Sequence, residues 1–242
     1  MPRMPWFERD DVRIHYEVHG QGSPVLLFAP GGMRSSIAVW ARAPWNPIAE
    51  LQGSFRVIAM DQRNAGQSSA PVHAGDGWRS YANDHVALLD HLGIERCALL
   101  GGCIGSSFCL GLIEAAPARV AAAVLQNPIG LYENREMFHA FFDDWAAELS
   151  KQQPEVPAAT WSAMRERMYG GDFVFNVSRD FVRRCPAPLL ILEGSDPYHP
   201  TPISRELTAL APNAELITGW KEAARLPGVI DQVRAFLARH SV

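Results

Sequence analysis

One cysteine lies between glycines at a point where an apolar strand is predicted to turn directly into a helix. Residues 99–105 read LLGGCIG, which contains the pattern G-x-C-x-G. In the related pattern G-x-S-x-G, the central residue sits on a sharp strand-to-helix turn with its reactive atom exposed. Glycines around a small buried cysteine also occur at ordinary strand ends, so the interpretation of Cys103 depends on the rest of the chain.

Short apolar runs alternate with longer helical patterns along most of the chain. This alternation is typical of strand–helix units around a mainly parallel sheet, so an α/β fold is predicted. The expected elements are an antiparallel pair at residues 6–8 and 13–18, strands at 24–29, 55–60, 97–100, 120–125 and 188–192, a weaker strand at 214–217, and helices at 81–92, 104–116 and 229–239.

A segment near the middle of the chain interrupts this alternation. It contains no good strand and is rich in aromatic and methionine side chains. We expect a helical cap of residues 131–186 over the strand ends of a core formed by residues 1–130 and 187–242. The aromatic side chains indicate a pocket for a small apolar or aromatic molecule, although each of them also fits the cap's own core. The candidate substrate contacts are Phe142, Trp145 and Trp220.

Charge and composition exclude several classes of protein. The formal net charge is −4 and 48% of the residues are hydrophobic, so a substantial core is expected and nucleic acid is not an expected partner. The N-terminus lacks a signal peptide's apolar segment, and no apolar run approaches the ~18 residues of a membrane span. We therefore expect a cytoplasmic monomer or homodimer without a membrane partner. The four cysteines show no C-x-x-C spacing, and neither a metal nor a cofactor is expected.

Three further motifs resemble those of a known family. Residues 61–68 read DQRNAGQS and are similar to a D-x-R-x-x-G-x-S loop, while Tyr81 and Asp84 lie on a predicted helix leading to the cysteine strand. Residues 116–120, APARV, match a P-x-R-V segment before the next strand. Together with the cysteine turn, these motifs resemble the α/β-hydrolase superfamily. The resemblance implies an eight-stranded, mainly parallel sheet flanked by helices, with a helical cap inserted after the sixth strand.

The resemblance also implies roles for residues near the cysteine. Cys103 would be the nucleophile, and a position at a helix N-terminus lowers the pKa of a thiol. Ile104 would supply one backbone N–H to an oxyanion, and Gly32 or Met33, in the loop after residue 29, would supply the second. Asp196, which follows a predicted strand, would be the acid that orients a base; its alternative role is to cap a turn.

The expected histidine is not where the resemblance would place it. The family carries it after the last strand, where this chain reads TGWKE at residues 218–222, so Trp220 or Lys221 occupies the position. His199, three residues after Asp196, is the best candidate base, and a desolvated Lys221 is an alternative. His73 and His139 are candidates to line the pocket. The other histidines are expected to face solvent: His15, His19, His85, His91 and His240.

Two functional hypotheses follow from these residues. The first is a cysteine-dependent hydrolase or acyl-transfer enzyme that acts on a small apolar or aromatic ester, thioester or lactone. Without a base, Cys103 would acylate readily and the thioester would hydrolyse slowly, because the attacking water needs a base. The alternative is a non-hydrolytic member of the fold that binds a small ligand or uses it in a lyase-type reaction.

Overall fold

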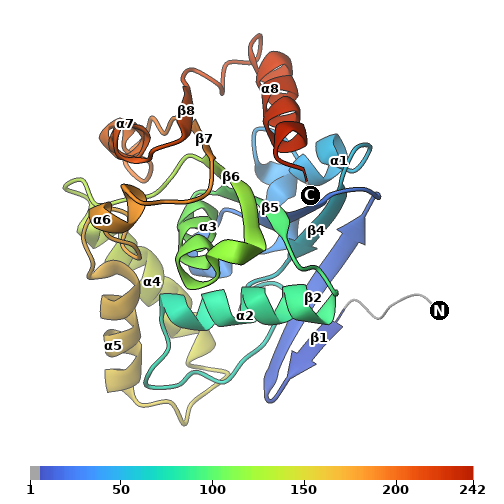
Figure 1. The fold of residues 1–242 in the computed structure, drawn as a ribbon. Helices are drawn as coiled ribbons and strands as arrows, with labels where there is room; N and C mark the ends of the chain where they lie inside the picture. Colours follow the sequence, from blue (N-terminus) through green and yellow to red (C-terminus); the bar gives the residue numbers. More distant parts are fainter. Residues whose placement is uncertain (1–5, 242) are drawn as a thin grey trace.

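An eight-stranded sheet forms the centre of the molecule (Figure 1). The computed structural model describes residues 6–241. The strand order is β1-β2-β4-β3-β5-β6-β7-β8; β2 is antiparallel to both neighbours and all other pairs are parallel, which confirms the predicted architecture. The strands are β1 (Trp6–Arg9), β2 (Val12–His19), β3 (Pro24–Phe28), β4 (Arg56–Met60), β5 (Cys97–Gly102), β6 (Val120–Gln126), β7 (Leu189–Leu192) and β8 (Ala214–Ile217).

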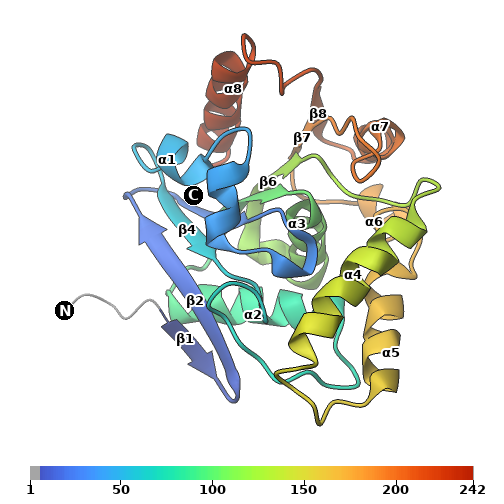
Figure 2. The ribbon, with the colours of Figure 1, turned by 180° about the vertical axis from the view of Figure 1, so that it is seen from behind.

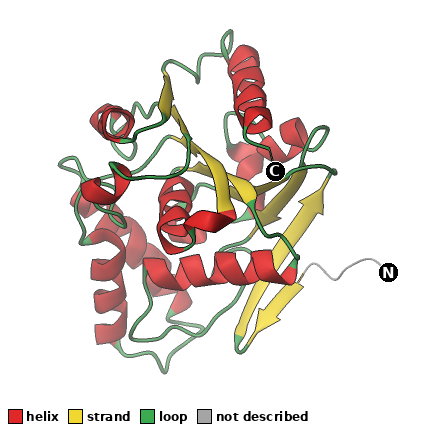
Figure 3. Cartoon of the chain, viewed as in Figure 1, coloured by secondary structure: helices red, strands yellow, loops and turns green. Residues whose placement is uncertain are grey.

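Helices cover both faces of this sheet (Figure 3). Successive strand residues alternate between two apolar clusters: Leu26 packs on the face covered by α2 and α3, and Leu27 on the face covered by α1 and α8. None of the helices in residues 6–241 is long and apolar enough to cross a membrane. The helices are α1 (Pro47–Leu51), α2 (Trp78–His91), α3 (Ile104–Ala115), α4 (Arg135–Leu149), α5 (Ala158–Tyr169), α6 (Arg179–Val182), α7 (Thr201–Leu210) and α8 (Leu226–Arg239), with short 3₁₀ turns η1 (Gly32–Arg34), η2 (Ile37–Arg42) and η3 (Pro117–Arg119).

Helices α4, α5 and α6 come between β6 and β7 and contain the aromatic-rich segment. Helices α4 and α5 lie at the opposite end of the molecule from α8 (Figure 2). Arg34, in the turn after β3, forms ion pairs with Asp144 and Glu148 of α4. The side chain of Gln153, between α4 and α5, accepts from the N–H of Val72 at 2.9 Å and donates to a core carbonyl. The inserted helices are therefore attached to the core by polar contacts as well as by apolar packing.

The glycines around Cys103 let β5 and α3 approach each other closely. A Cβ on Gly101 would lie 2.1 Å from the carbonyl oxygen of Gly105, and a Cβ on Gly105 would lie 2.2 Å from the carbonyl oxygen of Phe28. Any side chain at either position would collide with backbone. The G-x-C-x-G pattern is thus required by the packing of α3 against β3 and β5.

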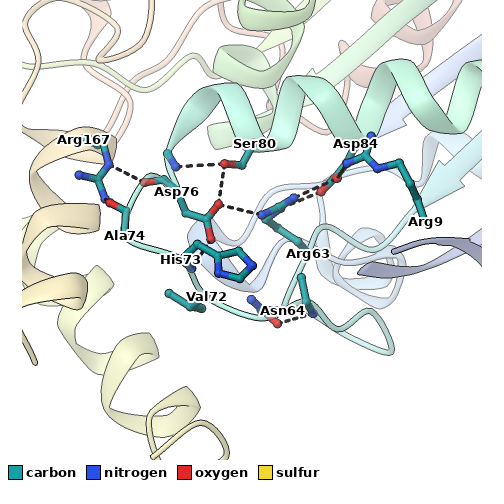
Figure 4. Close-up of polar contacts among 12 residues, drawn as sticks. Arg9, Arg63, Asn64, Val72, His73, Ala74, Asp76, Ser80, Asp84 and Arg167 are labelled. Carbon is teal, nitrogen blue, oxygen red and sulfur yellow. Dashed lines mark hydrogen bonds and ion pairs between the residues drawn. The ribbon is translucent and has the colours of Figure 1, made fainter. Parts of the chain in front are cut away.

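A buried ion-pair network ties the loop after β4 to α2 (Figure 4). Arg63 donates to both carboxylate oxygens of Asp84, at 2.7 and 3.0 Å, and to Asp76 at 3.1 Å. Arg9 reaches Asp84 at 3.0 Å from the edge of the sheet, and Arg167 of α5 donates to the carbonyl oxygens of Ala74 and Asp76. Arg63, the arginine of the D-x-R-x-x-G-x-S motif, is therefore a structural residue.

Two histidines expected at the surface are buried, so that expectation was wrong for them. His15 lies 3.3 Å from Asp61, and His85 contacts the Gln62 side chain at 2.8 Å. Burial and the positive charge of Arg63 lower the pKa of His85 to about 3, so this ring is neutral at physiological pH. Strand and helix periodicity did not reveal that both rings pack against the loop after β4.

Replacing Arg63 by methionine should destabilise the fold strongly. The change leaves the buried carboxylates of Asp84 and Asp76 without their principal cation, which costs about 3–5 kcal/mol. Arg79 is the control, because it is exposed on α2, the helix that carries Asp84, and forms no ion pair within residues 6–241. Urea unfolding should show a change within about 0.5 kcal/mol for Arg79→Met. Equal losses for the two variants would contradict the structural role of the network.

Candidate active site

Cys103 occupies the sharp turn between β5 and α3. Its φ of 58° and ψ of −120° lie outside the regions that L-residues usually adopt. The turn is held by the N–H of Cys103, which donates to the carbonyl oxygen of Gln126 at 2.9 Å. The Ser106 hydroxyl also donates to Gly101 O at 3.0 Å. Backbone strain of this kind costs about 1–3 kcal/mol and clusters at functional sites.

His199 lies between Cys103 and Asp196. Its Nδ1 is 2.7 Å from Asp196 Oδ1, and its buried Nε2 has no conventional hydrogen-bond partner within residues 6–241. The Cys103 sulfur interacts with this ring closely enough for each group to shift the pKa of the other. The structure therefore brings together the three residues expected from the sequence as nucleophile, base and acid.

The loop after β7 places an acid and a base three residues apart on one small turn. The N–H of His199 donates to Asp196 O at 2.9 Å, and the N–H of Asp196 donates back to His199 O at 3.3 Å. Asp196 Oδ1 also accepts the N–H groups of Tyr198 and His199, each at 3.1 Å. Gly194 is required beneath this turn, because a Cβ there would lie 2.3 Å from His199 O. The carboxylate and the imidazole are thus held by the same backbone bonds.

The charges of this group stabilise one another. Burial raises the pKa of the Cys103 thiol, but His199 and the N–H groups of Ile104 and Gly31 bring it below its ordinary value. Burial lowers the pKa of His199, but Cys103 and Asp196 raise it. The combined effect of these two residues is larger, so the pKa lies above its ordinary value. Both shifts favour a thiolate paired with an imidazolium. Burial instead raises the pKa of the other three thiols, Cys97, Cys109 and Cys185.

Lys221 contacts the acid rather than the cysteine. Its Nζ lies 3.2 Å from Asp196 Oδ2, the oxygen that His199 does not use. Burial raises the pKa of Asp196, but His199 and Lys221 together bring it below the ordinary value. Lys221 does not line the cavity at Cys103. The alternative of Lys221 as the base therefore has no support from its position.

The oxyanion candidates lie at the start of α3 and in the loop after β3. The N–H groups of Ile104 and Gly31 lie close enough to the Cys103 sulfur to lower the pKa of its thiol. Gly32 lines the cavity with a φ of 58°, and a Cβ there would meet the Phe141 ring at 2.0 Å. Met33 is buried in the apolar core. Gly31, which was not predicted, is a further candidate donor beside the sulfur; the donor role expected for the backbone N–H of Gly32 or Met33 stays a prediction.

A largely apolar cavity of about 360 Å³ opens beside Cys103. Helix α4 contributes Phe138 and Phe141, and the loop after β7 contributes Tyr198 and His199. Arg42 is also part of the wall, and among the described residues no acidic side chain lines the cavity. The remaining apolar and aromatic lining consists of Pro30, Val39, Ala43, Pro44, Ile104, Ile129 and Tyr169.

The three aromatic residues expected to contact substrate do not line this cavity, so those predictions were wrong. Phe142 is fully buried and packs against Trp145, whose Nε1 donates to Asn64 O at 3.2 Å. Trp220 belongs to the apolar cluster on the other face of the sheet, and its Nε1 donates to Glu193 O at 3.0 Å. Phe142 and Trp145 pack in the protein's interior, which was the alternative weighed for the aromatic residues of the cap.

Neither of the other two pocket histidines reaches the cavity. His73 is exposed in the loop before α2, and His139 points toward Glu166 at 3.9 Å. Within the described part of the chain, no three histidine, cysteine or acidic side chains are arranged to hold a metal ion. His199 is therefore the histidine that the described residues bring to Cys103.

The fold and the cysteine turn identify the class of protein. Residues 24–197 match the family model described as alpha/beta hydrolase fold. The matched segment is more than half of the chain, and the chain belongs to the α/β-hydrolase family.

Two curated relatives of this chain share one name. A "Putative carbamate hydrolase RutD" from Variovorax paradoxus (strain S110) is 39% identical over 114 residues, covering 47% of this chain and 42% of the relative. Another RutD, from Stutzerimonas stutzeri (strain A1501), is 31% identical over 164 residues, covering 66% and 58%. The chain spans about half the length of the curated relatives that it matches.

Solved structures show the same fold. An enol-lactonase from Burkholderia xenovorans LB400 has a TM-score of 0.68 at 20% identity, covering 97% of this chain and 100% of that chain. A meta-cleavage product hydrolase from Pseudomonas fluorescens IP01 has a TM-score of 0.70 at 22% identity, covering 94% and 95%. At these identities, the likeness establishes the fold and leaves the chemistry to the site.

Replacing His199 by alanine should raise the pKa of Cys103. The substitution removes the cation that stabilises the thiolate, and burial then dominates. The rate of iodoacetamide alkylation of Cys103, followed by intact mass, should therefore rise at a higher pH than in the wild type. Lys221→Met is the graded control, because Lys221 pairs with Asp196 and does not itself shift the pKa of Cys103, so the variant should shift the profile less. Identical profiles for wild type and His199→Ala would show that the ring does not stabilise the thiolate.

Proposed function

We propose that this protein is a cysteine-dependent hydrolase of small carbonyl compounds, with Cys103 as nucleophile and His199 as base. The main support is the continuous Cys103–His199–Asp196 arrangement at the wall of an apolar cavity. It pairs a thiol of lowered pKa with an imidazole of raised pKa, which is the pairing that activates a cysteine nucleophile. The family membership and the names of its relatives support hydrolysis as the reaction class.

In the first step, the Cys103 thiolate attacks the substrate's carbonyl carbon and a carbon–sulfur bond forms. The carbonyl π electrons move to oxygen, and the N–H groups of Gly31 and Ile104 would stabilise that charge, because both donors converge beside the sulfur. When the carbonyl re-forms, the bond to the leaving group breaks. His199 gives its proton to the leaving group, which leaves a thioester on Cys103 and a neutral imidazole.

In the second step, water cleaves the thioester. Neutral His199 takes a proton from the water as its oxygen attacks the carbonyl, and the carbon–sulfur bond then breaks to restore the thiolate. Asp196 keeps Nδ1 protonated and leaves Nε2 free to accept. Slow deacylation was expected if no base accompanied Cys103; the position of His199 instead supports complete turnover and favours hydrolysis over the non-hydrolytic alternative.

The cavity supports a small ester, thioester or lactone as the substrate. Its volume of about 360 Å³ suits a compact molecule, and its walls are mainly aromatic and aliphatic. Residues 131–186 would act as a cap that excludes water, because Phe138 and Phe141 of α4 form part of the wall. A small-molecule substrate accounts for the site without a cofactor.

Incubation with a p-nitrophenyl ester should distinguish the two steps. Intact mass should show a transient acyl adduct in the wild type, no adduct in Cys103→Ala, and a long-lived adduct in His199→Ala, where deacylation lacks its base. Loss of a triad member typically costs a factor of about 10³ or more in turnover. Peptide mapping should locate the adduct on Cys103.

Two results would contradict this function. Undiminished turnover in Cys103→Ala would exclude the cysteine as nucleophile. An adduct that disappears equally fast in wild type and His199→Ala would exclude His199 as the base for deacylation. The buried cysteine variant Cys109→Ala is the control, because its thiol lies in the core away from the cavity lining.

A further inference from the structure

Two amide side chains at the end of β6 line the cavity beside Cys103. Gln126 is the last residue of the strand, and its carbonyl oxygen accepts the Cys103 N–H at 2.9 Å. Neighbouring residues of a regular strand point to opposite faces of the sheet. Asn127 instead has a φ of 47°, which turns the chain so that both residues line the same cavity.

The Gln126 amide has a defined orientation. Its Oε1 accepts a hydrogen bond from the Trp45 indole N–H at 2.7 Å, so the other end of the amide is the Nε2 donor. That Nε2 would lie 3.5 Å from a Cβ placed on Gly102, which immediately precedes Cys103. Within residues 6–241, this donor has no hydrogen-bond partner. Gln126 therefore offers an N–H donor close to the nucleophile.

Asn127 offers an acceptor without a partner. The residue is only 8% exposed, and its buried Oδ1 makes no hydrogen bond within the described part of the chain. Leaving such a buried group unpaired is energetically unfavourable, because it loses its hydrogen bonds to water. Among the described residues, the buried side-chain polar atoms that both lack a partner and belong to the cavity lining are His199 Nε2 and Asn127 Oδ1. His199 Nε2 faces the reacting group, so the partner of Asn127 should also come from the molecule that enters.

A donor and an acceptor on adjacent residues complement a group that contains one C=O and one N–H. We propose that Gln126 and Asn127 form a subsite for a secondary amide, with Gln126 Nε2 donating to its carbonyl oxygen and Asn127 Oδ1 accepting its N–H. The preferred substrate would then be an acyl compound that carries a secondary amide next to the reacting carbonyl. This inference rests on the proposed acylation of Cys103 and narrows the substrate class for that reaction.

Three p-nitrophenyl esters of matched length separate the two hydrogen bonds. The N-acetylglycyl ester carries both amide groups, the levulinoyl ester replaces N–H by CH₂, and the pentanoyl ester also lacks the inner C=O. After normalisation to the hydroxide-catalysed rates, kcat/KM should fall by about 10-fold at each replacement, as expected for the loss of one hydrogen bond. Equal normalised values for the three esters in the wild type would overturn the proposal.

Two variants assign each preference to its residue. Asn127→Gly removes the acceptor and tolerates the positive φ, so the N-acetylglycyl to levulinoyl ratio should fall to about one while the levulinoyl to pentanoyl ratio persists. Gln126→Glu keeps an acceptor for the Trp45 indole and removes the donor, so the levulinoyl to pentanoyl ratio should collapse instead. Ratios that do not change in these variants would overturn the assignment of the subsite.

Asn176→Ala is the matched control. Asn176 also has a buried Oδ1 without a partner in residues 6–241, but it does not line this cavity, so both ratios should stay at their wild-type values. Inhibition of the wild type provides a readout without variants: N-acetylglycinamide should compete at least about 10-fold better than pentanamide. Equal inhibition by the two amides would contradict the subsite.

The experiment also separates failure of the subsite from failure of the proposed function. If all three esters acylate Cys103 at equal normalised rates, only the amide subsite is wrong. If none of the esters acylates Cys103 in intact-mass measurements, the cysteine mechanism is wrong and the subsite inference falls with it. A preference for the N-acetylglycyl ester that Asn127→Gly abolishes would support both.

Discussion

The hydrogen bond between Asp196 and His199 is the interaction on which the rest of the site depends. At 2.7 Å, it fixes the imidazole with Nε2 directed into the cavity where Cys103 lies. The backbone bonds that close the turn hold the carboxylate and the ring in one unit, so the acid and the base cannot separate without breaking the loop. Lys221 adds a second ion pair to the other oxygen of Asp196. His199, held in this way, favours the thiolate form of Cys103.

The sheet brings these parts together because the carboxyl ends of parallel strands meet at one edge. The loops after β3, β5, β6 and β7 carry Gly31, Cys103, Asn127 and His199 respectively, and all four residues line one cavity. Close glycine contacts let α3 begin directly behind the cysteine. Helix α4 then closes the cavity with aromatic side chains. Most of the polar groups converge near the sulfur, whereas the rest of the wall is largely apolar.

The local patterns of the sequence were enough to predict the sheet and the cysteine turn. Strand patterns and the glycines around Cys103 report short-range geometry, which the packing of α3 against β5 then requires. His199 follows Asp196 by three positions, so the sequence also predicted that the two residues lie near each other. It did not show the hydrogen bonds that orient the imidazole ring. His199 was therefore one candidate base among several in the sequence, and the structure gives it a definite position beside Asp196 and Cys103.

The predictions about substrate contacts failed because they depend on tertiary packing, which the pattern of residues along a sequence does not show. Phe142 and Trp145 are as aromatic as Phe138, and only the rotation of α4 decides which of them faces the cavity. Trp220 lies on the opposite face of the sheet, which its position after β8 did not reveal. Which N–H of the loop after β3 points toward the sulfur depends on the loop's backbone geometry, which the sequence does not show. Each case is decided by tertiary packing.

The central claim is that His199 and Cys103 form an ion pair, and histidine nitrogen NMR tests it most directly. Titration of ¹⁵N-histidine-labelled protein should show the His199 ring remaining an imidazolium above the ordinary histidine pKa of about 6.5. Its pKa should fall when Cys103 is replaced by alanine, because the paired negative charge is then absent. A His199 pKa that is the same in the wild type and in Cys103→Ala would contradict the account.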